Sequence, residues 1–163
     1  MPATDTSQKH ALHDDALDAD VAFVGERIGF ASTEEGPDTH RWTEVAIYRT
    51  VGGNYIVHKT GRTRVVHKAD SRCSSTAKTI TDPYDDAVSC PRCKPNLDLD
   101  DSFLEETDRS SVHVCQQAQG VIDVLFTKDP SGVTYMTTTA RLALRQATSR
   151  DDGLRAVNTV RVD

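Results

Sequence analysis

A run of alternating apolar and polar residues between positions 42 and 67 constrains the fold of this chain more than any other feature. Three segments in it, "TEVAIYRT", "NYIVHK" and "TRVVH", alternate with a period of two, which is typical of strands with one buried face. Gly52 and Gly53 separate the first two segments, and Gly61 separates the second from the third. Because glycine adopts the positive φ of tight hairpin turns, the sequence predicts an antiparallel β meander over residues 42–67.

The segments that flank the meander differ in character. Residues 1–20 are polar and acidic without sustained periodicity, so they predict a disordered acidic tail. "VAFVGERIGFAS" at 21–32 predicts a strand interrupted by Gly25 and Gly29. Residues 68–108 predict a long loop region, and loops of that length are uncommon in compact domains unless something such as a metal organises them.

The C-terminal part, residues 109–163, predicts helices. "SSVHVC" predicts one more strand, and "QQAQGVIDVLF" then carries its apolar residues at the spacing of an amphipathic helix. "TTTARLALRQATSRD" predicts a second helix with a threonine cap, whereas "LRAVNTVRV" fits a last helical turn or an edge strand equally well. We therefore predict one α+β domain over 21–163: a β meander at 21–67, a zinc-stapled loop region at 68–108, and helices from 109.

Cys90 and Cys93, in "SCPRCKP", form a C-x2-C turn. Such a turn supplies one edge of a tetrahedral zinc site, and structural zinc sites take two further ligands from elsewhere. Pro91 fixes φ early in the turn, and Arg92 and Lys94 lower the cost of gathering thiolates close together. This turn therefore predicts structural Zn²⁺.

The second edge of the site has three candidate ligands: His67, Cys73 and Cys115. His67 ends a predicted strand six residues before Cys73, so a short loop brings both to one ion. Cys115 would give an all-cysteine site, although cysteine is also among the residues most often buried in cores. We predict His67, Cys73, Cys90 and Cys93, with Cys115 as the alternative fourth ligand.

Catalytic interpretations of the same turn fit the sequence less well than a structural zinc site does. A redox C-x-x-C sits at the start of a helix after a buried strand, but Pro95 would interrupt that helix and "DPYDDAVS" is a poor buried strand. Zinc deaminases need H-x-E before P-C-x-x-C, whereas Ala69 stands where the glutamate should be. The chain also lacks a phosphate-cradling glycine loop, H-E-x-x-H and G-x-S-x-G.

The net charge of −6 conceals a basic stretch. Residues 41–72 contain seven arginine and lysine residues against Glu44 and Asp70. A local basic face binds nucleic acid whatever the total charge, while a solvated sheet face explains the same charges. The residues that would contact nucleic acid are Arg49, Lys59, Arg62, Arg64 and Lys68.

The location of the protein follows from what the sequence does not contain. No apolar run approaches the length of a membrane span, and the start lacks the features of a signal peptide. We therefore expect no membrane partner and a cytoplasmic protein, where thiols stay reduced. Four cysteines in a cytoplasmic chain favour metal binding over disulfides.

The stretch "RWTEVAIYRTVGGNYIVHKTGRTRVVH", with the later "CPRCKP", resembles small uncharacterised proteins of actinobacteria and their phages, some of them labelled for an EXLDI motif. The shared pattern comprises Trp42, Glu44, Tyr48, Arg49, Thr50, Gly53, Tyr55, His58 and Gly61. The resemblance covers about a sixth of the chain, which has no EXLDI string. It implies a small β module of mobile-element type, without an activity to transfer.

Together these patterns predict a non-enzymatic, zinc-stabilised binding or regulatory module whose partner is an unidentified protein. A nucleic-acid-binding protein that uses the basic hairpins at 41–72 is the first alternative. A C-x-x-C redox protein is the second.

Overall fold

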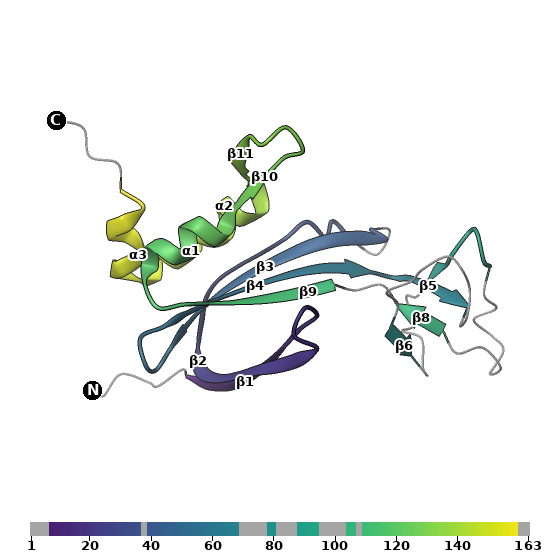
Figure 1. Cartoon of the computed structure of the whole chain (residues 1–163), viewed down its shortest axis with the longest axis horizontal. Helices are drawn as coiled ribbons and strands as arrows, with labels where there is room; N and C mark the ends of the chain where they lie inside the picture. The colour runs from purple at the N-terminus through teal and green to yellow at the C-terminus, as the bar shows by residue number, and fades with distance from the viewer. Residues whose placement is uncertain are drawn as a thin grey trace. The chain divides into compact units, whose positions relative to one another are not determined.

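The computed structural model describes residues 7–36, 39–68, 78–80, 88–94, 104–106 and 109–159 (Figure 1). The chain forms two compact units. The first unit comprises Met1–Ser32, Glu44–Lys59 and Ser110–Asp163, and the second comprises Thr33–Thr43 and Thr60–Arg109.

The first unit is built on a curled sheet of five strands in the order β1-β2-β3-β4-β9. Its strands are β1 (Gln8–Asp14), β2 (Ala19–Ser32), β3 (Arg41–Thr50), β4 (Tyr55–Thr63) and β9 (Arg109–Cys115). β2 pairs antiparallel with both β1 and β3. The predicted α+β class, with an antiparallel sheet followed by C-terminal helices, is confirmed. In the turn between β3 and β4, Gly53 has a φ of 87°, as the prediction of a glycine turn requires.

The predicted disordered tail at 1–20 is corrected by strand β1 and the start of β2, while its first six residues lie outside the described part of the chain. All seven residues of β1 are in register with β2, from Gln8 opposite Gly25 to Asp14 opposite Ala19. The buried carboxylate of Asp14 accepts hydrogen bonds from the amides of Leu17 (2.9 Å) and Val112 (2.8 Å). Polarity misled the prediction, because pairing with β2 and the anchoring of Asp14 hold this segment despite its few apolar residues.

Strand β2 is continuous, where the sequence suggested an interruption at its glycines. Its register against β3 shifts between Arg27 and Gly29, which marks a β-bulge at the buried Ile28. A Cβ on Gly29 would lie 2.2 Å from the carbonyl oxygen of Ala143 in helix α2 (Thr138–Arg150). Glycine is therefore needed here for the close approach of a helix to the sheet.

Both predicted helices are confirmed. α1 spans Ala118–Leu125, and α2 begins after Thr137, whose side chain accepts a hydrogen bond from the amide of Ala140 (3.1 Å). Residues 154–157 of the last segment belong to a third helix, α3 (Asp152–Val157), which is the helical alternative of the prediction. Between α1 and α2 lies a hairpin that the sequence did not predict, β10 (Phe126–Lys128) with β11 (Thr134–Met136).

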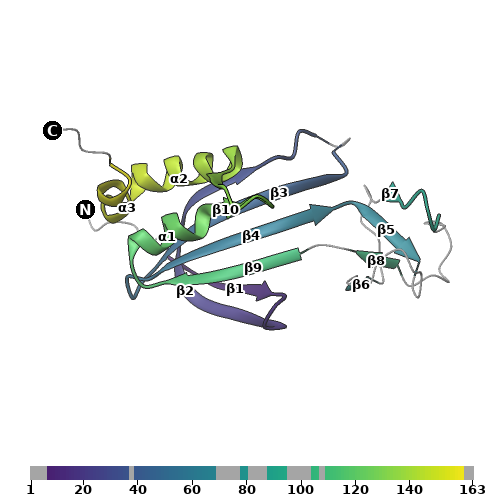
Figure 2. The ribbon, with the colours of Figure 1, turned by 45° about the horizontal axis from the view of Figure 1, so that its top comes forward.

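Alternating residues of β3 pack on opposite faces of the sheet. Val45 and Ile47 belong to the larger apolar cluster with residues of all three helices, whereas Ala46 and Tyr48 belong to a second cluster with residues of β1 and β2. Figure 2 shows the helices over one face, and Figure 1 shows β1 curled beneath the other. Because both faces are covered, β3 is apolar at four consecutive positions.

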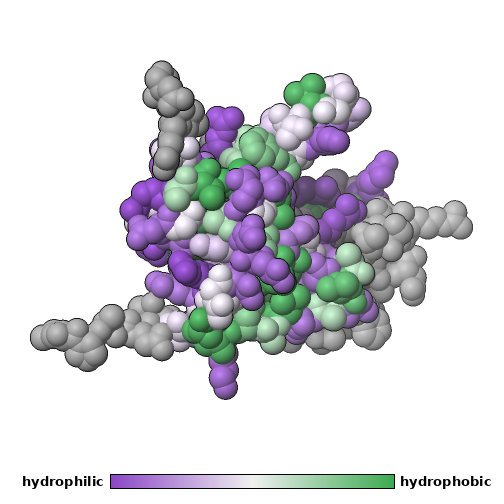
Figure 3. Space-filling model, turned by 60° about the vertical axis from the view of Figure 1, so that its left-hand side comes forward, coloured by the Kyte–Doolittle hydropathy of each residue, from purple (hydrophilic) through white to green (hydrophobic). Residues whose placement is uncertain are grey.

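One face of the structure is largely polar. Figure 3 shows hydrophilic side chains over much of one face, with hydrophobic ones scattered between them. The most exposed large hydrophobic residues come from separate turns and strands, and include Leu17, Val51, Val114 and Val133. Within the described part of the chain, no helix has the length and apolar character that a bilayer crossing requires.

The second unit contains a sheet of four short strands in the order β6-β8-β5-β7. They are β5 (Val65–Lys68), β6 (Lys78–Ile80), β7 (Val88–Ser89) and β8 (Leu104–Glu106). The prediction that β5 is the third strand of the meander is wrong, because β5 pairs with β7 and β8. Gly61 accordingly lies within β4 and not in a turn.

Candidate metal centre

The pairing of β5 with β7 brings His67 next to Cys90. The two strands run parallel, with Val65 opposite Val88 and Val66 opposite Ser89, so the next residues along the chain are neighbours. The amide of Cys90 continues the pairing by donating to the carbonyl of Val66 (3.0 Å). Residues 23 positions apart in the sequence thus meet because of backbone pairing, and His67 and Cys90 are both buried.

A tight turn then brings Cys93 back beside Cys90. Pro91–Cys93 form the turn, and the amide of Lys94 donates to the carbonyl of Cys90 (2.8 Å). Lys94 has a φ of 47°, a left-handed conformation that is uncommon outside glycine, asparagine and aspartate. The amide of Arg92 also donates to the Cys90 sulfur (3.4 Å).

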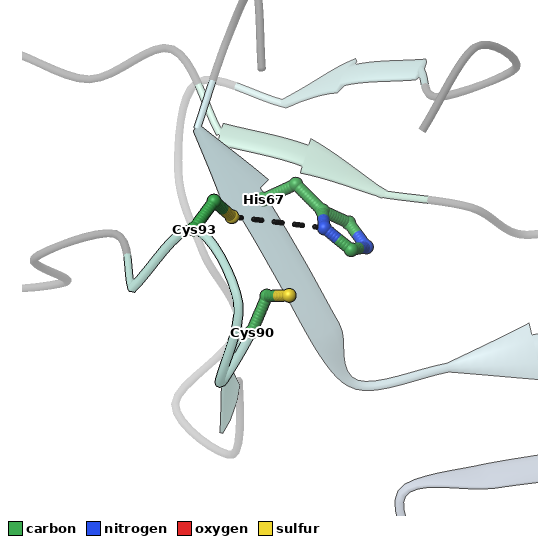
Figure 4. A group of neighbouring side chains, drawn as sticks. All are labelled: His67, Cys90 and Cys93. Carbon is green, nitrogen blue, oxygen red and sulfur yellow. Dashed lines mark hydrogen bonds between the residues drawn. The ribbon is translucent and has the colours of Figure 1, made fainter. Parts of the chain in front are cut away.

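The three side chains converge on one point (Figure 4). The His67 ring comes from β5 and both thiols come from the turn, and their ligand atoms all lie within 4.8 Å of one another. Cys93 Sγ is 3.7 Å from His67 Nδ1. Sulfur at about 2.3 Å and nitrogen at about 2.05 Å from a tetrahedral metal ion would be about 3.6 Å apart, so the observed spacing needs almost no adjustment. This group could hold a metal ion.

The other predicted ligands lie elsewhere. Cys73 falls outside the described residues. Cys115 is buried in the larger apolar cluster of the first unit, where a Cβ on Gly120 would lie 3.5 Å from its sulfur. Burial raises the pKa of the Cys115 thiol, and the charge of Asp123 raises it further. Cys115 therefore has the environment of an unreactive core cysteine.

Arg64, predicted for a basic nucleic-acid face, contacts Trp42 inside the second unit. The Arg64 guanidinium lies 4.4 Å from the centre of the Trp42 ring, pairs with Glu34 (2.5 Å) and donates to the Thr39 carbonyl. Only 9% of the Arg64 side chain is exposed. This arginine is fixed within the protein and has little surface left for a phosphate.

Two further residues predicted to contact nucleic acid, Arg49 and Lys59, form contacts within the first unit. Arg49 forms an ion pair with the buried Asp151. Lys59 donates to the Val124 carbonyl (2.5 Å), and burial lowers its pKa. The Arg62 residue is exposed, while the side chain of Lys68 lies outside the described residues.

The C-x2-C turn does not have the setting of a redox motif. A thiol–disulfide site uses the start of a helix to stabilise its thiolate. In the described part of the chain, no helix begins at Cys90 or Cys93; the residues between them form a turn, and Lys94 leaves it with a positive φ.

A cavity that the sequence did not predict lies beside the group formed by His67, Cys90 and Cys93. The cavity has a volume of about 530 Å³ and is lined by His40, Arg41, Val65, His67, Cys90, Pro91 and Arg92. These residues come from three separate segments of the second unit. No local pattern could reveal the cavity, because the pairing of β5 with β7 is what assembles it.

Comparison of the chain with protein-family models, curated proteins and solved structures found no match.

Proposed function

We propose that this protein is a non-enzymatic binding module whose second unit is held together by one structural zinc ion. The ion would join β5 to the turn at 90–94 through His67, Cys90 and Cys93. Cys73 would complete the site, as the spacing of the sequence predicts. The observation that carries the proposal is the convergence of these three ligand atoms within 4.8 Å.

The donor set supports zinc over other common ions. Imidazole nitrogen with two or three cysteine sulfurs is a ligand combination of tetrahedral structural zinc sites, whereas magnesium and calcium prefer oxygen. His67 and Cys90 are 5% and 4% exposed, so little solvent reaches the two ligands. A site closed by four protein ligands leaves no position for a reacting water, which supports a structural role.

The short strand pairing in the second unit also favours stabilisation by a metal. β7 has two residues and pairs with β5 through two register positions, which is far too little sheet to be stable alone. Binding free energy at a structural zinc site adds directly to folding free energy. A zinc ion that joins β5 to the turn after β7 would supply what this short pairing lacks.

Metal analysis of the purified chain tests the proposal. Protein prepared without added metal and passed over a desalting column should carry about one zinc per chain by mass spectrometry. Cys93→Ser should lose most of that zinc, because serine is a poor zinc ligand. Cys115→Ala is the matched control and should keep it, since Cys115 lies in the core of the first unit.

Two results would contradict the proposal. One is an unsubstituted protein with less than about half an equivalent of zinc whose Cys90 and Cys93 react readily with iodoacetamide, since bound zinc protects thiolates from alkylation. The other is an equal loss of zinc in Cys115→Ala and Cys93→Ser.

A further inference from the structure

The cavity beside the metal group carries an excess of positive charge. Arg41 and Arg92 approach it from segments 51 positions apart in the sequence, and His40 adds a third nitrogen-bearing side chain. Among the described residues that line the cavity there is no carboxylate. Arg41 and Arg92 are both exposed, and neither forms an ion pair with an acidic side chain in the part of the chain that the structure describes.

This arrangement differs from that of Arg64, a buried arginine of the second unit. Arg64 is neutralised by Glu34 and covered by Trp42, so its charge serves the fold. Among the described residues, no carboxylate pairs with Arg41 or Arg92 in this way. The planar guanidinium group binds phosphate and carboxylate oxygens through paired hydrogen bonds, so two arginines that line one cavity favour an anion there.

Much of the remaining described wall of the cavity is apolar. Val65 and Pro91 contribute hydrocarbon surface, and the neighbouring His67 and Cys90 are held by the pairing of β5 with β7. A volume of about 530 Å³ lies in the range of small-molecule sites, which combine apolar walls with a few polar groups. The walls therefore suit an organic body and the rim suits its anionic group.

We propose that this cavity binds a small organic phosphate, with the phosphate group between Arg41 and Arg92 and the apolar body against Val65 and Pro91. A phosphomonoester carries close to two negative charges at neutral pH, which matches two arginines; a carboxylate matches one. The inference rests on the proposed function, because the zinc ligands His67 and Cys90 form part of the wall.

Titration calorimetry with phenyl phosphate on the zinc-loaded full chain tests the inference. Phenyl phosphate should bind at one site and at least about tenfold more tightly than benzoate, which has one negative charge, or inorganic phosphate, which has no apolar body. Arg41→Gln and Arg92→Gln should each weaken binding at least about tenfold. Arg141→Gln, which removes one exposed charge from α2 in the first unit, should leave it unchanged.

Amide chemical-shift changes in the unsubstituted protein give a second readout that does not depend on the variants' folding. They should be largest at residues 40, 41 and 92. The inference is overturned by no binding of phenyl phosphate, by shifts confined to the first unit, or by equal weakening in Arg141→Gln. It is likewise overturned by a single-stranded oligonucleotide that binds at these residues where phenyl phosphate does not.

Zinc content measured on the same sample separates this inference from the proposed function. A full equivalent of zinc without phenyl phosphate binding overturns the phosphate site and leaves the metal site standing. Binding of phenyl phosphate to protein that carries no zinc supports the cavity and contradicts the structural metal.

Discussion

Asp151 joins the end of α2, the start of α3 and the sheet through its buried carboxylate. It accepts hydrogen bonds from the amide of Leu154 (2.9 Å) and the hydroxyl of Tyr55 (2.8 Å), and it pairs with Arg49. Burial raises the pKa of Asp151, but the hydrogen bonds from Leu154, Tyr55 and Arg49 outweigh that effect and hold the pKa below its ordinary value of 3.8. The ionised carboxylate therefore stabilises the first unit.

Replacing Asp151 with asparagine should destabilise the protein by about 2 kcal/mol at pH 7, because the charged acceptor for Arg49 and Tyr55 is lost. A carboxylate with a lowered folded pKa contributes its full stabilisation above its unfolded pKa and loses it as the pH falls through the folded pKa. The free energies of unfolding of Asp151→Asn and the unsubstituted protein, measured in urea, should converge below pH 3.8.

Tyr55→Phe is the matched comparison, since it removes one hydrogen bond to Asp151 and keeps the ring. It should cost about 1 kcal/mol at pH 7. A difference between Asp151→Asn and the unsubstituted protein that stays constant from pH 7 to pH 3 would contradict this account of Asp151.

At the same scale, the sequence predicted Cys90, Cys93 and His67 together, and the structure brings these three to one point. The C-x2-C spacing is local, so it could be recognised directly. The part played by Arg64 could not be, because its contacts with Glu34 and Trp42 depend on how distant segments meet. For the same reason nothing in the sequence placed Arg41 and Arg92 at one cavity.

At the scale of elements, the alternation of apolar and polar residues predicted which segments are strands more reliably than it predicted which strands pair. β3 and β4 were predicted as a hairpin and are neighbours in the sheet. β5 was predicted to extend that hairpin, yet it pairs with Val88–Ser89 and Leu104–Glu106. Period-two alternation shows that a segment is a strand, but the strand's partners depend on segments far along the chain.

Two glycines distinguish the observed β4 from the predicted one. Gly53 has a φ of 87° in the turn before β4, whereas Gly61 lies inside the strand, and a Cβ there would lie 4.0 Å from its nearest neighbouring atom, the Arg109 carbonyl oxygen. Gly53→Ala should therefore destabilise the protein by about 1 kcal/mol or more, since alanine tolerates positive φ poorly, while Gly61→Ala should be neutral or slightly stabilising. Urea unfolding of both variants measures the difference between their free energies of unfolding. Equal destabilisation would support the predicted turn at Gly61 and contradict its place within β4.

At the scale of the whole molecule, the two units are stabilised differently. The first has helices packed on one face of its sheet and a second apolar cluster on the other. The second has four short strands, and the proposed zinc site lies on two of its segments. Removing the metal should therefore loosen the second unit and leave the first folded.

Hydrogen–deuterium exchange with and without a chelator tests this expectation. Chelation should speed exchange at least about tenfold at three amides: Val88 and Cys90, which donate to the carbonyls of Arg64 and Val66, and Lys94, which closes the turn onto the Cys90 carbonyl. Exchange in α2 should not change. Two outcomes would show that the metal does not act as a local support of the second unit. One is faster exchange throughout α2, and the other is an unchanged exchange rate at residues 88–94.

An anomalous difference map from crystals of the zinc-bearing protein, recorded on either side of the zinc absorption edge, tests the central claim most directly. We expect one peak about 2.3 Å from the sulfurs of Cys90 and Cys93 and about 2.0 Å from Nδ1 of His67, with Cys73 as the fourth ligand. A map without a peak at these three residues, or with its peak at other side chains, would contradict that claim.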